Sequence, residues 1–258
     1  MAPMGDVGVL EELQAHPVGH SGKLAGVDTE GLVAFVASEL EGLADPERAR
    51  QMAAYMKTDM PFYGVTSAER KLVFRQARQL FPVETPDDYE AAILALWSQP
   101  QREAKYLGLA YTTEHRKQID VEWMGLYEKL IVEGAWWDLV DDVAVHAVGR
   151  ALLRQRREVT PIVRSWIDSE NLWLRRTAII CQVRHKFETD EALLFDHALA
   201  CLHEKEFFIR KAIGWALRDY SWFEPEAVRS FLLEHRHEMS GLTYREGAKR
   251  IPDMPPYK

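Results

Sequence analysis

The sequence predicts an all-α protein, specifically an α-α superhelix of HEAT-like helical repeats that forms a curved solenoid with a basic concave face. From Thr29 onward, apolar residues recur at the spacing of amphipathic helices, as in LVAFVASELEGL, RKLVFRQARQLF and YEAAILALW. The period-two alternation that is typical of strands is absent from the sequence. Prolines separate the periodic stretches at points where helices are expected to begin or end, namely Pro46, Pro61, Pro82, Pro86, Pro100, Pro161 and Pro225.

Internal similarity adds the repeat architecture. Residues 173–178 (WLRRTA) match residues 208–213 (FIRKAI) at an offset of 35, and residues 97–107 lie 69 positions ahead of the similar residues 166–176, close to two such periods. A degenerate repeat of about 35 to 40 residues with two helices each is typical of HEAT-like arrays, which curve and usually bind partners on the concave surface. A globular bundle without true repeats is the alternative.

The chain is expected to divide into an arm over residues 1–26, a repeat domain over residues 27–250 and a tail over residues 251–258. The arm is rich in small and turn-forming residues, with one short amphipathic piece around residues 9–13. Its GHSGK segment lacks the glycine spacing of a phosphate-binding loop, and Leu24 stands where such a loop has Ser or Thr.

Two further classes of protein are not supported. No apolar run approaches the roughly 20 residues of a membrane span, and the start of the chain lacks the pattern of a signal peptide, so we expect no membrane association. The two cysteines, Cys181 and Cys201, have no second pair and no ligand spacing around them. We therefore expect buried free thiols, with neither a disulfide framework nor a metal site.

The charge is unevenly distributed. The formal net charge of −8 argues against a nucleic-acid binder, but residues 1–145 carry −11 and residues 146–258 carry +3. Residues 147–186 alone carry +6. Such a block is either a solvated helix face or part of a nucleic-acid-binding surface. Its basic residues are Arg150, Arg154, Arg156, Arg157, Arg164, Arg175, Arg176, Arg184 and Lys186.

Three windows combine Trp with charged residues, namely residues 134–142, 171–176 and 205–220. In the first, Trp137 and Asp141 are four residues apart and therefore share one face of a helix. In the others, Trp173 and Arg176, and then Trp215 and Arg218, are three residues apart. Each window offers an aromatic face beside a charge.

Each of these residues also has a structural interpretation. A Trp on a repeat helix is more often core packing than a ligand wall, most of all Trp136, Trp166 and Trp173. Asp138 is a plausible N-cap and Asp142 an ordinary first-turn acid. Arg175 and Arg210 could simply be solvated.

The segments WWDLVD, NLWLRR and KEFFIRKAIGWALRDY, in this order and spacing, resemble the bacterial DNA alkylation repair glycosylases of the AlkD family. The resemblance covers roughly residues 45–250, and the long third segment is the most specific. It implies a stack of HEAT-like repeats that acts on DNA bearing N3- or N7-alkylated purines, with no cofactor.

Carried over by motif position, the resemblance implies that Asp141 is the catalytic carboxylate and that Trp137 and Trp215 flank the lesion. Tyr55 is a weaker lesion-binding candidate. DNA-binding roles fall on the cations of the last two windows, Arg175, Arg176, Lys211 and Arg218. One departure from the family is Thr66-Ser67-Ala68, where the family commonly has Gln-Thr-Pro, which puts in doubt any wedge contact made by this loop.

The expected function is thus monofunctional excision of cationic alkylpurines from double-stranded DNA by a monomeric, bacterial and cytoplasmic enzyme that is nucleoid-associated when bound to DNA. No lysine in these windows has an obvious Schiff-base role, which argues against lyase activity. One alternative is a non-catalytic HEAT-like module that binds damaged or branched DNA. Another is a protein-interaction scaffold that engages a partner through the acidic first half.

Overall fold

The computed structural model describes residues 26–257, so the expected arm over residues 1–26 lies outside the described residues except for Gly26. Over residues 26–257 the regular structure is entirely helical, which confirms the all-α class. No helix in that range is long and apolar enough to cross a bilayer. The α-helices are α1 (Thr29–Gly42), α2 (Pro46–Met56), α3 (Ser67–Leu80), α4 (Pro86–Trp97), α5 (Arg102–Glu114), α6 (Met124–Gly134), α7 (Trp137–Val143), α8 (Gly149–Arg154), α9 (Arg156–Ile167), α10 (Leu172–Ile180), α11 (Glu191–Cys201), α12 (Phe207–Tyr220), α13 (Pro225–Glu234) and α14 (Gly241–Gly247).

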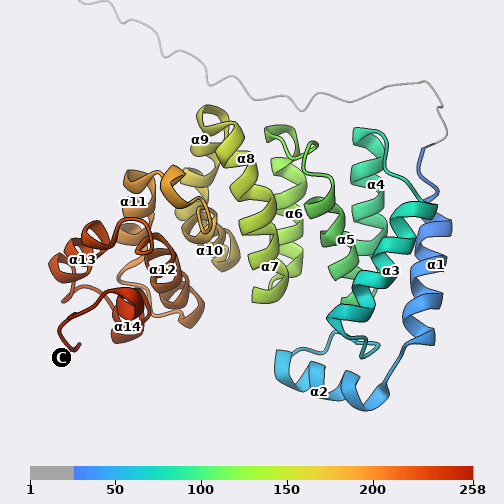
Figure 1. The fold of residues 1–258 in the computed structure, drawn as a ribbon, viewed down its shortest axis with the longest axis horizontal. Helices are drawn as coiled ribbons and strands as arrows, with labels where there is room; N and C mark the ends of the chain where they lie inside the picture. The colour runs from blue at the N-terminus through green and yellow to red at the C-terminus, as the bar shows by residue number, and fades with distance from the viewer. Residues whose placement is uncertain (1–25, 258) are drawn as a thin grey trace, which may run out of the picture.

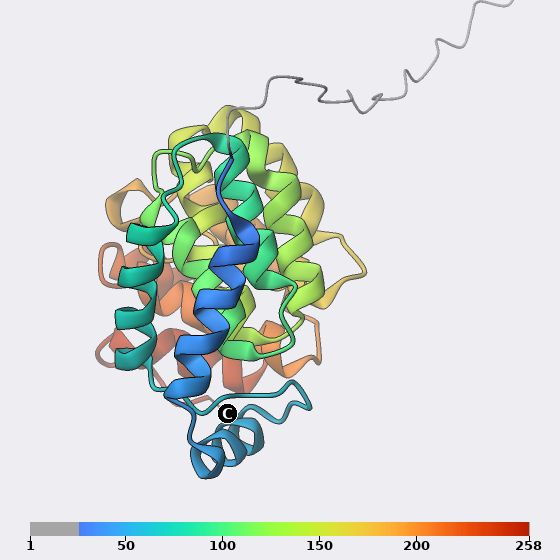
Figure 2. The same cartoon turned by 90° about the vertical axis from the view of Figure 1, so that its right-hand side faces the viewer.

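The helices follow one another as a curved row in chain order (Figure 1). They pack in successive pairs, α1 with α3, α4 with α5, α6 with α7, α9 with α10, α11 with α12 and α13 with α14. The second helices of the pairs, α3, α5, α7, α10, α12 and α14, contact one another in series and form one layer, here called the inner helices. Seen end-on, α2 stands apart from the layered pairs at one edge (Figure 2). This arrangement confirms the predicted superhelix of repeats.

Contacts between neighbouring pairs recur at the period predicted from the sequence. Trp173 and Phe208, which align in the repeat, occupy the first turns of α10 and α12, and their ring centroids are 5.0 Å apart. Polar contacts join residues 35 or 36 positions apart along the stack, among them Trp97–Glu133, Arg102–Asp138, Asp141–Arg176, Gly149–His185 and Arg184–Asp219. Equivalent positions of consecutive repeats therefore face each other throughout the stack.

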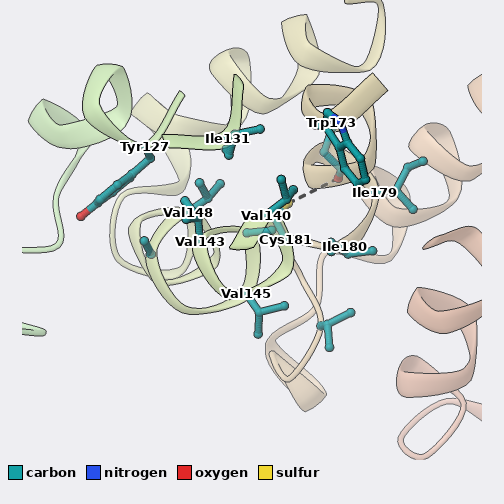
Figure 3. Close-up of a cluster of buried hydrophobic side chains, with 14 of the residues drawn as sticks. Tyr127, Ile131, Val140, Val143, Val145, Val148, Trp173, Ile179, Ile180 and Cys181 are labelled. Atoms are coloured by element: carbon teal, nitrogen blue, oxygen red, sulfur yellow. Dashed lines mark hydrogen bonds between the residues drawn. The ribbon is translucent and has the colours of Figure 1, made fainter. Parts of the chain in front are cut away.

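The central inner helix is continuous from α7 through a π-helical turn, η2 (Ala144–Val148), into α8. A π-turn inserts one extra residue and widens the helix locally. The widened turn brings Gly149 against α10, where a Cβ at this position would lie 2.2 Å from the carbonyl oxygen of Cys181. Figure 3 shows the apolar side chains of α6, α7, η2 and α10 that fill the space between these helices, with Cys181 among them. Both cysteines are buried free thiols, as expected.

Most prolines mark helix boundaries as predicted. Pro46, Pro86 and Pro225 are the first residues of α2, α4 and α13, where the missing N–H has no intrahelical partner to lose. The prediction for Pro161 is wrong, because this residue lies inside α9. Its ring is on an exposed position, so water can satisfy the carbonyl that loses its helical hydrogen bond.

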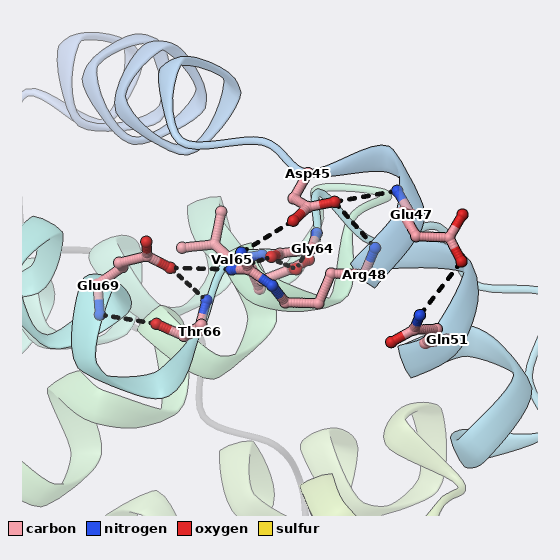
Figure 4. A network of polar contacts seen from close by, with 9 residues as sticks. Asp45, Glu47, Arg48, Gln51, Gly64, Val65, Thr66 and Glu69 are labelled. Carbon is pink, nitrogen blue, oxygen red and sulfur yellow. Dashed lines mark hydrogen bonds and ion pairs between the residues drawn. The ribbon is translucent and has the colours of Figure 1, made fainter.

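A polar network holds α2 against the start of α3 (Figure 4). Gly64 adopts φ +85°, and a Cβ there would lie 2.2 Å from the backbone oxygen of Asp45, so this turn requires glycine. Arg48 donates to the Gly64 carbonyl and also pairs with Asp45. Thr66, at the position where the sequence departs from the family pattern, caps α3 reciprocally with Glu69.

A buried carboxylate completes the same turn. Glu103 is fully buried and accepts hydrogen bonds from the backbone N–H groups of Tyr63, Gly64 and Val65 at 2.8 to 3.1 Å. This arrangement fixes the chain that leads from α2 into α3, and with it the position of α2 relative to α5. The end of α2 reaches the candidate site described next.

Candidate active site

An aromatic cavity of about 630 Å³ lies between α2 and the ends of three inner helices. Its wall combines aromatic rings with three cations: Tyr55, Lys57, Trp136, Trp137, Arg176, Phe207, Phe208 and Lys211. Four of these residues, Tyr55, Trp137, Arg176 and Lys211, are among those singled out from the sequence, and the fold brings them together from α2, α7, α10 and α12. We call this space the aromatic cavity.

The turn between α6 and α7 places two indoles in the wall. Ala135 adopts a left-handed conformation at φ 38°, and Trp136 is extended before α7 begins at Trp137. Trp136 packs on Trp173 and Phe208, with ring centroids 6.0 and 5.4 Å apart. Trp173 is buried, as the packing interpretation predicts, whereas Trp136 is only half-buried and reaches the cavity.

The N-cap prediction for Asp138 is wrong. An N-cap at Asp138 would make Leu139 the first residue of the helix, but α7 starts two residues earlier, at Trp137. Asp138 therefore lies in the first turn, and Trp136 at the N-cap makes no side-chain cap. The Asp138 carboxylate instead accepts hydrogen bonds from Nε and Nη2 of the buried Arg102 and from the hydroxyl of Tyr106. This pair anchors the start of α7, and therefore Trp137, to α5.

Asp141 forms a two-pronged ion pair with Arg176 across the interface between α7 and α10. Nε of Arg176 donates to Oδ1 and Nη2 donates to Oδ2, each at 2.7 Å. The third nitrogen, Nη1, donates to the carbonyl oxygen of Phe208 at 2.6 Å. Arg176 thus lines the aromatic cavity and presents Asp141 directly behind it. The Asp141 side chain keeps 17% of its surface accessible.

The electrostatics of Asp141 reflect its position. Burial raises the pKa of the Asp141 carboxyl, the hydrogen bonds and charge of Arg176 oppose that shift, and the nearby Asp138 adds to it. A carboxylate offers about four acceptor positions, of which Arg176 occupies two. The ion pair therefore leaves Asp141 capable of accepting a further hydrogen bond.

Asp142 is not the ordinary first-turn acid that the sequence suggested. It lies beyond the first turn of α7, and its Oδ1 is buried without a hydrogen-bond partner among the residues that the structure describes. Burial raises the pKa of Asp142 to about 6, partly opposed by the charge of Arg184. Asp141 and Asp142 are adjacent in sequence but lie in different surroundings.

Three of the cations predicted to bind DNA have carboxylate partners outside the cavity wall. Glu246 of α14 pairs with Lys211 at 3.1 Å and with Arg218 at 2.5 Å, and Lys249 also contacts it. Although burial opposes the shift, hydrogen bonds from Lys249 and Lys211 lower the pKa of Glu246 to about 2. Arg175 is held by Glu204 and by two backbone carbonyls, so it is neither solvated nor in the cavity.

The two remaining lesion-binding predictions have different placements. Tyr55 stands at the end of α2, is 76% exposed and lines the aromatic cavity. Trp215 lies on α12 one turn beyond Lys211, is half-buried against the core and is not among the residues of the wall. The structure therefore groups Tyr55 with Trp137 but leaves Trp215 beside the cavity.

Sequence reasoning missed Lys57, Phe207 and Phe208. The alignment of Phe208 with Trp173 in the repeat was the available signal, because Trp173 belongs to the same kind of window. Lys57 gave no signal, since its place in the wall depends on the left-handed conformation that ends α2 at φ 51°.

Known proteins resemble this chain in sequence and in fold. A family model described as DNA alkylation repair enzyme matches residues 36–251. Among solved structures, a predicted DNA alkylation repair enzyme from Enterococcus faecalis is similar with 29% identity and a TM-score of 0.76, over 82% of this chain and 98% of that one. AlkD2 from Streptococcus mutans shares the fold at 17% identity and a TM-score of 0.50, over 87% and 100% of the two chains. No protein of curated function matches the sequence.

Proposed function

Because the chain belongs to the family of DNA alkylation repair enzymes, we propose that it is a monofunctional DNA glycosylase. The family places the protein in DNA repair. The proposal is more specific: the enzyme hydrolyses the N-glycosidic bond of cationic N3- or N7-alkylated purines in double-stranded DNA. The observation that carries it is the ion pair of Asp141 with Arg176, the arginine that lines the aromatic cavity.

The substrate determines which chemistry the protein must supply. A purine alkylated at N3 or N7 is already positively charged, so it leaves as a neutral base without protonation and needs no general acid. Positive charge instead develops on the deoxyribose at C1′ as the bond stretches. A carboxylate beside that sugar stabilises the charge electrostatically, and a water bound to the same carboxylate is oriented for attack.

Asp141 suits this role in its present setting. Its ion pair with Arg176 fixes the side chain on the rigid interface of two inner helices, so little reorganisation is required when the substrate binds. Arg176, which lines the cavity, also carries charge that a phosphate beside the lesion can share.

The aromatic rings suit the charged base. An indole or phenyl face attracts a cation by about 0.5 to 2 kcal/mol, so Trp137 and Phe208 favour a cationic purine over a neutral one. The cavity is open to solvent between α2 and α12, which suits a labile leaving group that needs no deep enclosure. Deep insertion of a flipped base is accordingly less important for this enzyme.

The decisive experiment is the release of 7-methylguanine from a duplex oligonucleotide in single-turnover conditions by wild-type protein and by Asp141→Asn. We expect the variant to lose at least about 100-fold in rate, as when one transition-state contact is removed, while duplex affinity changes by less than about threefold. Asp196→Asn is the matched control, because Asp196 also pairs with an arginine, Arg164, but on α11 and α9.

Unchanged release by a folded Asp141→Asn variant would remove Asp141 from the mechanism. No release by the wild-type protein above the spontaneous rate would favour a non-catalytic DNA-binding module. Unchanged DNA affinity of that variant with lost release would support catalysis. Release from Asp196→Asn should equal that of the wild type, since its carboxylate has no part in the cavity.

A further inference from the structure

A second cavity, of about 460 Å³, lies farther along the central inner helix and is lined by cations. Arg116 follows α5, His146 and Arg150 come from η2 and α8, and Arg184 follows α10. Over the described residues, no Asp or Glu belongs to its wall; the other lining residues are Thr113, Val145, Leu153, Val183 and His185. We call this space the arginine cavity.

The arginines of the arginine cavity have no ion-pair partners among the described residues. Within residues 26–257, the guanidinium groups of Arg116, Arg150 and Arg184 form no ion pair with a carboxylate. In the aromatic cavity, by contrast, two of the three cations, Arg176 and Lys211, each pair with a carboxylate. The stronger free attraction for an anion therefore lies in the arginine cavity and not beside the aromatic rings.

The cations also oppose one another. After burial, the charge of Arg116 lowers the pKa of Arg150, and all three arginines lower the pKa of His146. Two acids lie near the cluster: burial raises the pKa of Asp142 and the charge of Arg184 opposes that shift, and Asp219 accepts the backbone N–H of Arg184. Repulsion among like charges in a partly desolvated space is relieved when an anion enters.

Two of the segments that carry these cations are fixed by their own hydrogen bonds. Arg154 donates to the backbone carbonyls of Arg116, Lys117 and Ile119, which holds the turn after α5. The N–H of Arg184 donates to Oδ2 of Asp219 at 2.8 Å, in a left-handed turn with φ 75°. The backbone that carries Arg116 and Arg184 is therefore fixed before any ligand binds.

The two cavities open along the same layer of helices. Two smaller surface hollows connect them. The first hollow has Tyr55 in common with the aromatic cavity, the second has Thr113 in common with the arginine cavity, and Tyr106 lines both hollows. Along the continuous helix from α7 to α8, Trp137 and His146 are about 13 Å apart and Trp137 and Arg150 about 20 Å, at roughly 1.5 Å per residue. A polyanion seated at the aromatic cavity can reach this distance.

We propose that the arginine cavity binds a backbone phosphate of the DNA substrate, at a point one groove width or more away from the lesion. The identity of the ligand rests on the proposed function, whereas the affinity for a phosphate rests on the cluster itself. Guanidinium forks bind phosphate oxygens in pairs, and the major groove is about 12 Å wide, so a phosphate of either strand can reach the site. This second anchor sets the direction in which the duplex crosses the inner helices.

The test measures the affinity for a lesion-free duplex and for its single strand, by fluorescence anisotropy between about 50 and 200 mM salt. Arg150→Gln should weaken duplex binding by about tenfold and reduce the slope of log affinity against log salt by about one. Arg157→Gln is the matched control, because Arg157 is exposed on α9 and its substitution removes the same charge from another layer. It should leave the slope unchanged.

Arg116→Gln should weaken duplex binding and reduce the salt slope in the same way as Arg150→Gln. Because the Arg116 side chain is exposed, this second variant is expected to fold even if Arg150→Gln does not. A loss of affinity for duplex supports the phosphate site, and an equal loss for the single strand shows that the site binds a backbone phosphate without requiring the paired strand. Slopes for Arg150→Gln and Arg116→Gln that match Arg157→Gln would overturn the proposal.

Base release separates this proposal from the proposed function. At saturating methylated duplex, Arg150→Gln should release base at the wild-type single-turnover rate, because Arg150 lies about 20 Å from the aromatic cavity. If wild-type protein releases no base but Arg150→Gln still lowers the salt slope, the glycosylase assignment fails and the phosphate site stands.

Discussion

The Asp141–Arg176 pair can be tested by a double-mutant cycle on stability. Both side chains are largely buried, at 17% and 6% exposure, and Arg176 joins the carboxylate with two hydrogen bonds of 2.7 Å. Removing one partner of a buried pair costs about 3 to 5 kcal/mol. Because the amide introduced by Asp141→Asn still accepts one hydrogen bond, we expect this variant to cost about 2 kcal/mol. Arg176→Gln also deprives the Phe208 carbonyl of its donor, so it should cost about 3 to 4 kcal/mol.

The double variant should cost less than the sum of the two single variants by about 2 kcal/mol, since two neutral amides can pair with each other. Urea unfolding followed by circular dichroism measures the three free energies, and each 1 kcal/mol corresponds to a change in Tm of about 2 to 4 °C for a chain of this size. The cycle uses Asp196→Asn and Arg164→Gln, whose pair is about half exposed, as its control, and there the coupling should be below about 1 kcal/mol. Additive costs at Asp141 and Arg176 would mean that the two side chains do not pair in solution, and the positioning argument for catalysis would fail with them.

Two further predictions concern stability. Burial raises the pKa of Asp142 to about 6. Between about pH 4 and 6 this carboxyl is therefore protonated in the native state but ionised in the unfolded state, and the free energy of unfolding should fall as the pH rises through this range. Asp142→Asn should therefore be more stable than wild type by about 2 kcal/mol at pH 7.5, with the difference vanishing near pH 4 in urea titrations; a pH-independent difference would contradict the raised pKa. Gly64→Ala should lower the unfolding free energy by at least about 2 kcal/mol, because φ +85° and the Asp45 carbonyl leave no room for a Cβ, and a thermal melt equal to wild type would refute this geometry of the turn.

The sequence predicted the fold well because its signals are local. Helical periodicity and prolines at first helical positions depend on residues within a few positions of each other. Pro161 was placed wrongly because an exposed helix surface tolerates the lost hydrogen bond, and no local pattern reports exposure. The repeat period of 35 was visible in the sequence because equivalent residues such as Trp173 and Phe208 pack on one another and are therefore of the same chemical kind.

The candidate site was predicted only in part. The i, i+4 spacing of Trp137 and Asp141 is a property of one helix, and the structure keeps both on α7 beside the cavity. The role of Asp138 was predicted wrongly because its partner Arg102 is 36 residues away in the sequence. Contacts between repeats join residues that are similarly far apart, so local patterns do not reveal them. Trp215 was expected in the wall, but the packing of α12 directs Phe207 and Phe208 there instead.

The amino-acid sequence by itself determined the helices, their repeat and the motif that identifies the family, because each is written in neighbouring residues or in a fixed period. Only the tertiary structure decided which charges remain free. Within the basic block of residues 147–186, Arg154 and Arg175 are engaged by backbone or carboxylate partners, whereas Arg150 and Arg184 face an open cavity. The physical reason is that ion pairing depends on side chains one repeat away, and composition counts a paired arginine and a free one alike.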